Sequence, residues 1–344
     1  NVGVCDVTTL GKIDIKGPDA AEFLTRVYTN SFLKLAPGKC RYGVMLKEDG
    51  MIFDDGVCAC LGSNHYLMFT TTGGAAQVLA WLELWRQTEW SELKVYLTSV
   101  TDHWSTATIS GPDSRRVLQK VCVGTDLDNT HFPFMEWRNA DVAGVDARIF
   151  RISFTGELSF EINVPSHYAR HVWEALMDAG ASLDITPYGT ETMHVLRAEK
   201  GFMIVGQDTD GSMTPHDMGL DWVVNNSKEF SFLGKRSLDR SDMLRTDRKE
   251  FVGLKTLEAS KLLPEGGQLV FDPSEQTPMS MQGHITSSYY SASLGRPIAL
   301  GLVKGGFSRM GQIVYCPQPN GNTISAEIVS SVFYDRDGAR QNVE

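Results

Sequence analysis

The chain has 344 residues, of which 42% are hydrophobic and 22% are charged, and its formal net charge is −10. This composition is typical of a globular protein with two or three domains and a large buried core. The negative charge argues against a nucleic-acid interface, which needs a basic surface. The sequence has no apolar run near the ~20 residues that span a bilayer. We therefore expect partners other than nucleic acid or a membrane.

The six cysteines are scattered without C-x-x-C spacing, and the eight histidines form no H-E-x-x-H pattern. We expect neither a disulfide framework nor a metal site, and a reducing cytoplasm suits such thiols best. Residue 1 is Asn, and the chain opens directly into a strand-like run. This beginning suggests a processed piece or a part of a longer polypeptide.

A strand, a Gly-Pro-Asp turn and an amphipathic helix follow one another twice. The first turn is at 17–19 and the second at 111–113. Gly-Pro-Asp ends a strand and starts a helix, because proline has a helical φ and an early acid suits the helix dipole. The recurrence predicts two related α+β lobes, with chance repetition of a common helix start as the alternative.

Residues 47–57 predict two strands joined at Asp49-Gly50, a dipeptide typical of hairpin turns. Asp54 and Asp55 continue the returning strand. Since successive strand residues face opposite ways, only one of these acids can point inward. A buried acid needs hydrogen-bond donors or a positively charged ligand. The alternative is a solvated pair of acids at a strand end.

Periodicity predicts helices at about 74–87, 166–178 and 189–200, and strands near 65–70, 147–153 and 157–163. The last two strands form a hairpin around Thr155-Gly156. On the returning strand, Glu161 lies on the polar face with Ser159 and Asn163. This face is either an ordinary exposed one or a recognition surface.

The second half of the chain changes in character. Charged residues crowd between 228 and 250, which predicts a solvated linker with a short helix. The strands that follow predict a small barrel or sandwich, and lie near 251–256, 282–287, 298–303, 311–315 and 324–330. We therefore expect an α+β body at 1–245 and a β module at 246–344.

The Asp-Asp hairpin at 47–57 and the Thr-Gly-Glu hairpin at 150–164 resemble those of the folate-dependent aminomethyltransferase superfamily, typified by the T-protein of the glycine cleavage system. The resemblance implies two interlocked α+β lobes around a folate pocket and a C-terminal β-barrel. It also implies that Asp55 lies beside the reactive nitrogens of tetrahydrofolate. Glu161 would recognise the pterin ring, because a carboxylate can accept two parallel hydrogen bonds from adjacent N–H groups.

Further matches to the superfamily imply other folate contacts. Tyr42 would contact the pterin or benzoyl portion, and Met68 and Thr70 lie on the strand whose backbone binds pterin. The chain also departs from the pattern, since Phe154 replaces a tyrosine that many relatives carry.

The helix at 189–200 departs from the pattern too. Many T-proteins have an arginine early in this helix and another one turn later; here the early position is Met193 and the later one is Arg197. Arg197 either binds the folate or pairs with a neighbouring acid.

Residues 186–201, 206–210 and 283–291 resemble the C-terminal half of the alpha subunit of heterotetrameric sarcosine oxidase more closely than T-protein. The resemblance implies that a flavin, FAD or FMN, on a partner subunit oxidises sarcosine to an imine. The N5 atom of tetrahydrofolate would attack the imine carbon, so that glycine leaves and 5,10-methylenetetrahydrofolate forms. Asp55 would be the catalytic residue, orienting the attacking amine and assisting proton movement.

Two alternatives remain open at this point. One is a stand-alone folate-dependent aminomethyl- or methyltransferase with a different donor. The other is a non-catalytic module that binds folate or assists assembly.

Overall fold

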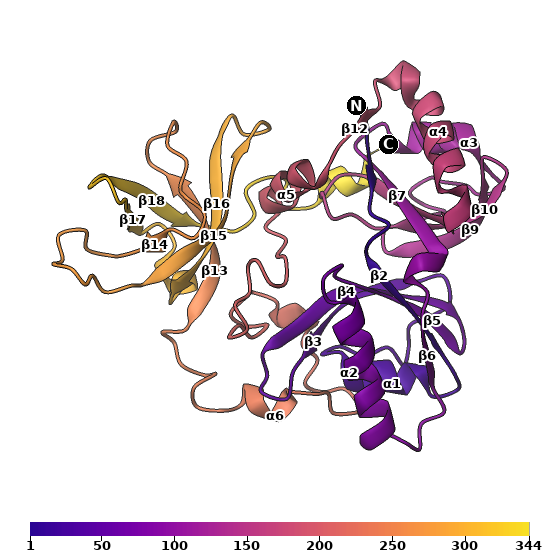
Figure 1. Ribbon diagram of the computed structural model, residues 1–344, viewed down its shortest axis with the longest axis horizontal. Coiled ribbons are helices and arrows are strands. Elements are labelled where there is room, and N and C mark those ends of the chain that lie inside the picture. The colour runs from indigo at the N-terminus through magenta and orange to yellow at the C-terminus, as the bar shows by residue number, and fades with distance from the viewer. Residues whose placement is uncertain (344) are drawn as a thin grey trace.

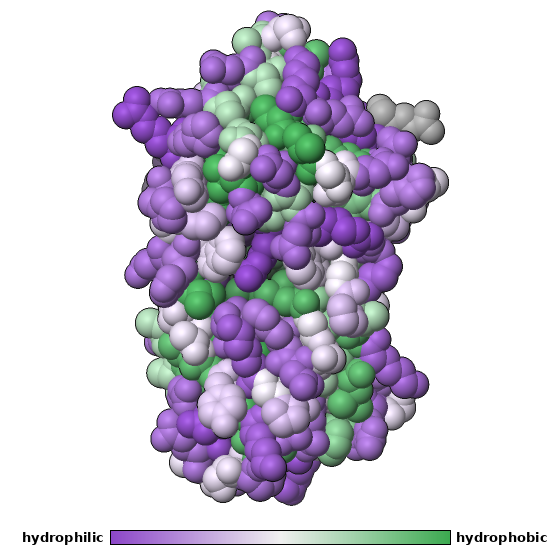
Figure 2. Space-filling view, turned by 90° about the vertical axis from the view of Figure 1, so that its right-hand side faces the viewer, coloured by the Kyte–Doolittle hydropathy of each residue, from purple (hydrophilic) through white to green (hydrophobic). Residues whose placement is uncertain are grey.

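The computed structural model describes residues 1–343, which form two α+β lobes and a β-barrel (Figure 1). In Figure 1 the barrel lies on the left, the second lobe at the upper right and the first lobe below it. Seen from the right-hand side, the two lobes stand one above the other, with a mostly polar surface (Figure 2). Among the described residues, no helix is long and apolar enough to cross a membrane.

The first lobe is a five-stranded antiparallel sheet with two helices packed on one face. The strands run in the order β3-β4-β5-β2-β6. The predicted Asp-Asp hairpin is confirmed as β3 and β4. The elements are β2 (Gly11–Lys16), α1 (Ala20–Val27), β3 (Cys40–Leu46), β4 (Ile52–Gly62), β5 (His65–Thr70), α2 (Ala75–Thr88) and β6 (Tyr96–Ser99).

The second lobe is a seven-stranded sheet in the order β12-β1-β7-β11-β10-β9-β8, with α3 and α4 on one face. Only the β1–β12 pair is parallel among the pairs of this sheet in residues 1–343. The elements are β1 (Gly3–Asp6), η1 (Thr101–His103), β7 (Trp104–Ser110), α3 (Ser114–Val121), β8 (Cys122–Val123), β9 (Glu136–Val142), β10 (Val145–Arg151), β11 (Ser159–Pro165), η2 (Ser166–Tyr168), α4 (Ala169–Gly180), η3 (Ala181–Leu183) and β12 (Thr186–Pro187).

The chain crosses between the lobes at its beginning. Strand β1 belongs to the second sheet, β2 to the first, and β7 returns to the second beside β1. The predicted interlocked lobes are therefore confirmed. Both predicted strand–turn–helix units also form, and each needs its glycine: Gly17 has φ +135° and Gly111 has φ +120°, a region that L side chains avoid.

The C-terminal strands form a closed six-stranded barrel rather than a sandwich. The sheet order is β14-β15-β16-β13-β18-β17, and Val270 and Tyr315 join its two edges through a pair of backbone hydrogen bonds of 2.9 and 3.0 Å. The elements are β13 (Lys249–Thr256), β14 (Gln268–Leu269), β15 (Gly283–Ser291), β16 (Arg296–Lys304), η5 (Gly306–Arg309), β17 (Ile313–Pro317) and β18 (Thr323–Val329).

The residues after β18 leave the barrel and return to the second lobe, although the β module predicted from the sequence extends to 344. Arg151 donates to the carbonyl of Gln341 at 3.0 Å, and Arg115 donates to the carbonyl of Val343 at 2.9 Å. Between the second lobe and the barrel lie α5 (Thr190–Glu199), η4 (Asp221–Val223) and α6 (Lys235–Leu238), and the final stretch contains η6 (Ala339–Asn342). The predicted boundary at 245 stays a prediction.

A fully buried ion pair between Arg197 and Asp208 joins helix α5 to the barrel. The carboxylate of Asp208 also accepts the backbone N–H of Ile204 at 2.9 Å and the hydroxyls of Thr286 and Ser287 on β15. A buried pair is stable only when its remaining hydrogen-bonding positions are filled, and here the segment after α5 and the barrel fill them. The pair therefore holds the barrel in position against helix α5.

We expect Asp208→Ala to lower the free energy of unfolding by about 3–5 kcal/mol, because it leaves the Arg197 charge buried without a partner. Urea denaturation followed by circular dichroism measures the change. Asp210→Ala is the matched control, since Asp210 is an exposed acid in the same loop, and it should change the value by about 0.5 kcal/mol or less. Equal losses in the two variants would contradict the structural role of the pair.

Candidate functional site

The Asp-Asp hairpin places two acids on opposite faces of β4, where Asp54 is buried and Asp55 is half-buried. Asp54 lies opposite Met45 and Asp55 opposite Val44. Asp54 is 1% exposed; its Oδ2 atom accepts the backbone N–H of Thr71 at 3.2 Å, at the turn that starts α2. The alternative of a solvated pair at a strand end is therefore wrong. Asp54 stabilises a turn, and Asp55 remains free for other contacts.

Asp55 faces a cavity and accepts one hydrogen bond from a neighbouring strand. The hydroxyl of Tyr42 on β3 donates to its Oδ2 atom at 2.7 Å. Burial raises the pKa of Asp55 to about 7; the Tyr42 hydrogen bond lowers it and the nearby charge of Asp54 raises it. The carboxyl group therefore exchanges its proton near neutral pH, as a general acid or base must.

Glu161 lies on β11 in the second lobe and is 9% exposed, so the alternative of an ordinary exposed face is wrong. Its polar neighbours on that face bond to β7: Ser159 lies 2.8 Å from Ser110, and the Oδ1 atom of Asn163 accepts from Thr106 at 2.8 Å, while the Nδ2 atom of Asn163 is buried without a partner in the described residues. The Oε2 atom of Glu161 is buried and has no hydrogen-bond partner in the described residues. Burial raises the pKa of this carboxyl to about 7.

Asp55 and Glu161, 106 residues apart in the sequence, line one cavity of about 1690 Å³. Both lobes, the segment after α5, the barrel and the final stretch all contribute to its walls. Its lining includes Tyr42, Phe69 and Thr70 from the first lobe, Thr108, Phe134 and Tyr188 from the second, and Met203, Met218, Trp222, Phe251, Val332 and Gln341 from the rest of the chain. The space is large enough for a fused-ring ligand of drug size or more.

The remaining residues expected at the site fall into two groups. Tyr42 and Thr70 line the cavity. The side chain of Met68 instead packs in the core of the first lobe beneath its helices, and Met68 does not line the cavity. Arg197 is held by Asp208 and does not line the cavity, whereas Met193, one turn earlier, does. The structure thus favours the acid-pair alternative for Arg197.

Sequence reasoning missed several residues of the cavity wall. Trp222 is 71% exposed and stacks on Tyr42 with ring centroids 5.8 Å apart. Phe154 stacks on Phe202 at 6.2 Å, and both rings line the cavity with His194. Trp222 had one available signal, since a large aromatic residue in a segment without regular periodicity suggests a contact surface.

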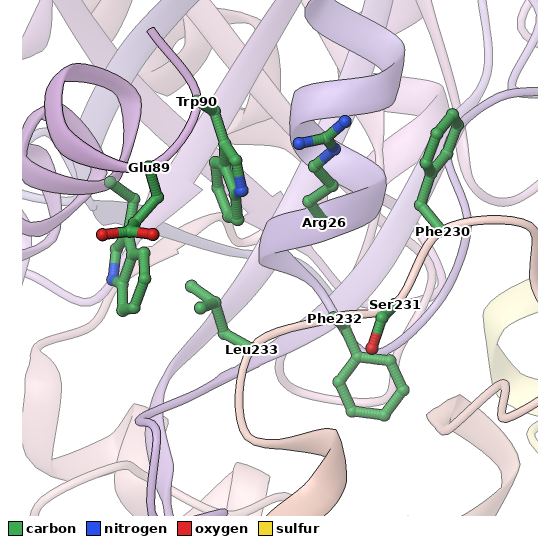
Figure 3. Close-up of a pocket in the computed structure, with 8 residues that line it drawn as sticks. Arg26, Glu89, Trp90, Phe230, Ser231, Phe232 and Leu233 are labelled. Atoms are coloured by element: carbon green, nitrogen blue, oxygen red, sulfur yellow. The ribbon is translucent and has the colours of Figure 1, made fainter.

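A second, smaller hollow of about 330 Å³ lies on the outside of the first lobe. Figure 3 shows Arg26 between Trp90 and Phe230 there, with Leu233 and Phe232 alongside. The Arg26 guanidinium lies 5.5 Å from the Trp90 ring and 5.3 Å from the Phe230 ring, and it is paired with Glu22 on its own helix. These groups are already satisfied by one another, so we take the larger cavity as the candidate site.

Comparisons with known proteins find relatives along the whole chain. The chain is 51% identical over 345 residues to the sarcosine oxidase subunit alpha of Corynebacterium sp. (strain P-1), covering 99% of this chain and 35% of that protein. It is 40% identical to the protein of the same name from Rhizobium meliloti, with 100% and 35% covered. The chain therefore spans about a third of the length of these curated relatives.

Other relatives are named aminomethyltransferase, and this chain covers most of their length. The aminomethyltransferase of Halothermothrix orenii is 31% identical over 331 residues, covering 96% of this chain and 88% of that protein. The crystal structure of the glycine cleavage system aminomethyltransferase T from Bartonella henselae matches with a TM-score of 0.84 and 25% identity, covering 97% of this chain and 87% of that one. This match confirms the predicted α+β fold with its C-terminal barrel.

Two family models divide the chain between them. One, described as the GCVT N-terminal domain, matches residues 1–228, and the other, described as the glycine cleavage T-protein C-terminal barrel domain, matches residues 249–335. The resemblance inferred from the two hairpins is thereby confirmed. With a cavity built by both lobes and the barrel, and family models covering almost all of its length, the chain belongs to the glycine cleavage T-protein (GCVT) family of aminomethyltransferases.

Proposed function

We propose that the cavity binds tetrahydrofolate and transfers a one-carbon unit to it. The observation that carries this proposal is the meeting of Asp55 and Glu161, one from each lobe, at the walls of one cavity. Glu161 offers a buried carboxylate oxygen that lacks a donor. The pterin ring carries adjacent ring and exocyclic N–H groups, which fit a carboxylate in a paired arrangement. Each charge-assisted bond of this kind contributes about 1.5–3 kcal/mol.

Aromatic groups in the cavity support the same ligand. Tyr42, Phe69 and Trp222 line it, and flat rings stack well on such side chains. Thr70 lies at the end of β5 next to Phe69, where its backbone can meet the ring edge. Tyr42 has a second task, since its hydroxyl holds the Asp55 carboxylate in place.

When bound, tetrahydrofolate supplies the nitrogen nucleophile for one-carbon transfer. Asp55 would hold a hydrogen bond to that amine and accept or return a proton there. Its pKa of about 7 suits both directions at neutral pH. The cavity would hold amine and one-carbon donor together, and such positioning supplies much of the acceleration in two-substrate reactions.

For the donor, we propose a sarcosine oxidase-type complex in which this chain is one domain of the alpha subunit. Support comes from the 51% and 40% identity to proteins named sarcosine oxidase subunit alpha. A flavin on a partner flavoprotein subunit would oxidise sarcosine to an imine. This domain would then convert the imine and tetrahydrofolate to 5,10-methylenetetrahydrofolate and glycine.

The six cysteines are free thiols, which fits a cytoplasmic location.

A stand-alone aminomethyltransferase is the second candidate, and the 31% identity over 88% of such an enzyme favours it. Affinity purification from the native cell separates the two candidates. Recovery with a flavin-containing subunit supports the sarcosine oxidase complex, and recovery alone supports the single transferase. A non-catalytic folate module, the third alternative, is tested by the Asp55 variant below.

We expect Asp55→Asn to lower the rate of 5,10-methylenetetrahydrofolate formation from formaldehyde and tetrahydrofolate, above the uncatalysed rate, by about 100-fold or more, because the amide cannot take a proton. Absorbance or mass spectrometry measures the product. Asp54→Asn is the matched control; it keeps the acceptor for the Thr71 N–H and should stay within a few-fold of the wild-type rate. A wild-type rate in Asp55→Asn would favour the non-catalytic module.

We expect Glu161→Gln to weaken binding of 5-formyltetrahydrofolate, a stable analogue, by about 10- to 100-fold, since the neutral amide loses the charge-assisted bonds and presents an N–H to the ligand donors. Isothermal titration calorimetry measures the dissociation constant. Glu157→Gln is the control on the same hairpin, where Glu157 pairs with Arg340 and does not line the cavity. Unchanged affinity in Glu161→Gln would remove the proposed pterin anchor.

We expect Tyr42→Phe to move the acidic limb of the pH–rate profile toward higher pH by about one unit. The Tyr42 hydroxyl donates to the ionised carboxylate and lowers the pKa of Asp55, so its loss raises that pKa further. Rates between pH 5.5 and 9 measure the shift. An acidic limb that stays in place or moves toward lower pH would show that Asp55 does not set the profile.

A further inference from the structure

Lys12 is a fully buried lysine on β2. It lies directly opposite Phe69 of β5, so both side chains share one face of the first sheet. Phe69 meets Phe150 of the second lobe edge-to-face, with ring centroids 5.2 Å apart. The Lys12 side chain therefore lies on the face where the two lobes meet, away from helices α1 and α2.

Glu161 occupies the corresponding place in the second lobe. It lies directly opposite Phe150 in the β10–β11 pair and so shares the face that meets the first lobe. A cation and an anion from different lobes thus flank one aromatic contact. The Lys12 charge lowers the pKa of Glu161 while burial raises it, and the Glu161 charge raises the pKa of Lys12 while burial lowers it to about 8. Each charge favours the ionised form of the other group.

The Lys12 ammonium is held in place by the backbone that leads into the cavity. Its Nζ atom donates to the carbonyls of Thr8 at 2.9 Å and Leu10 at 3.1 Å. These bonds use two of its three N–H groups. Thr9 and Leu10 line the cavity, so the ammonium sits directly behind the cavity wall, and its charge acts on Glu161 across the lobe boundary.

The other ionisable groups around this pair cannot replace Lys12. Asp6 of β1 and Asp102 of η1 are acids that act on Lys12. Cys40 of β3 and Tyr188 after β12 lie near Glu161, and burial raises the pKa of both groups, so they are neutral near pH 7. Among the described residues, Lys12 is the one cation that lowers the pKa of Glu161.

We propose that Lys12 is a positioning residue for ligand binding, whose ammonium favours the ionised form of the Glu161 carboxylate, the form that accepts the N–H groups of the pterin ring. The inference rests on the proposed function, because it requires Glu161 to be the ligand anchor. Lys12 itself touches no ligand in this scheme. It acts through Glu161.

A double-mutant cycle in the full chain tests this role. The dissociation constant of 5-formyltetrahydrofolate is measured between pH 6 and 8.5 for the wild type, Lys12→Gln, Glu161→Gln and the double variant. Removing the positive charge raises the pKa of Glu161, so Lys12→Gln should lose affinity at higher pH than the wild type. Because Glu161 with a pKa of about 7 is about half ionised at pH 7, a displacement of about one pH unit corresponds to about fivefold weaker binding at that pH. In the Glu161→Gln background the same change should have little effect.

Lys12→Arg keeps the charge and should keep the wild-type pH dependence, even if the larger side chain lowers stability. Equal weakening by Lys12→Gln in both backgrounds would overturn the inference, because Lys12 would then only hold the backbone. The inference would also be overturned if Lys12→Arg shifted the pH dependence of the dissociation constant as far as Lys12→Gln does. Unchanged binding in Glu161→Gln alone would instead overturn the proposed anchor, so the two failures are distinguishable.

Discussion

The structure depends on keeping two carboxyl groups out of water on the walls of one cavity. Burial raises the pKa of both Asp55 and Glu161 to about 7. The pKa of each acid is near 4 in the unfolded chain and about 7 in the folded one. The contribution of each acid to stability is therefore greatest below about pH 4 and is lost as the pH rises through about 7, where the buried carboxyl groups ionise. A ligand that brings N–H donors to both groups offsets this loss of stability. The proposed folate ligand would bring such donors to both places.

The geometry of the two acids follows from how the lobes are joined. Asp55 belongs to the first sheet and Glu161 to the second, and β1 and β2 tie the sheets together within the first sixteen residues. An aromatic cluster that includes Trp137 and Phe150 fills the space between the lobes. Because such interiors are closely packed, the lobes act as one rigid frame, and the separation of the acids is set by that frame.

The barrel and the final stretch form the part of the cavity wall that the two lobes do not supply. The Arg197–Asp208 pair anchors helix α5 against β15, and Arg151 and Arg115 hold the backbone of residues 341–343. Phe251 and Gln341 from these parts complete the cavity wall. These arginines donate hydrogen bonds to backbone and side-chain oxygens within the protein. Their N–H groups are therefore not directed at a ligand.

Local sequence determined much of the fold. The Asp49-Gly50 turn, the alternation along β4 and β11, the helical periods of α2 and α5 and the even spacing of the barrel strands all reflect backbone geometry, which neighbouring residues alone decide. Alternation correctly separated Asp54 from Asp55, and the family motifs pointed to Asp55 and Glu161. The sequence pattern could not show that Asp54 is buried at the start of α2.

Only the tertiary structure decided which side chains meet across lobes. Arg197 and Met193 share a helix face, yet one lies in an ion pair with Asp208 and the other at the cavity. Lys12 gave no signal in the sequence, because Glu161, whose charge acts on it, is 149 positions away. Burial and charge interactions depend on every element that packs around a residue, and no periodic pattern in the chain records them.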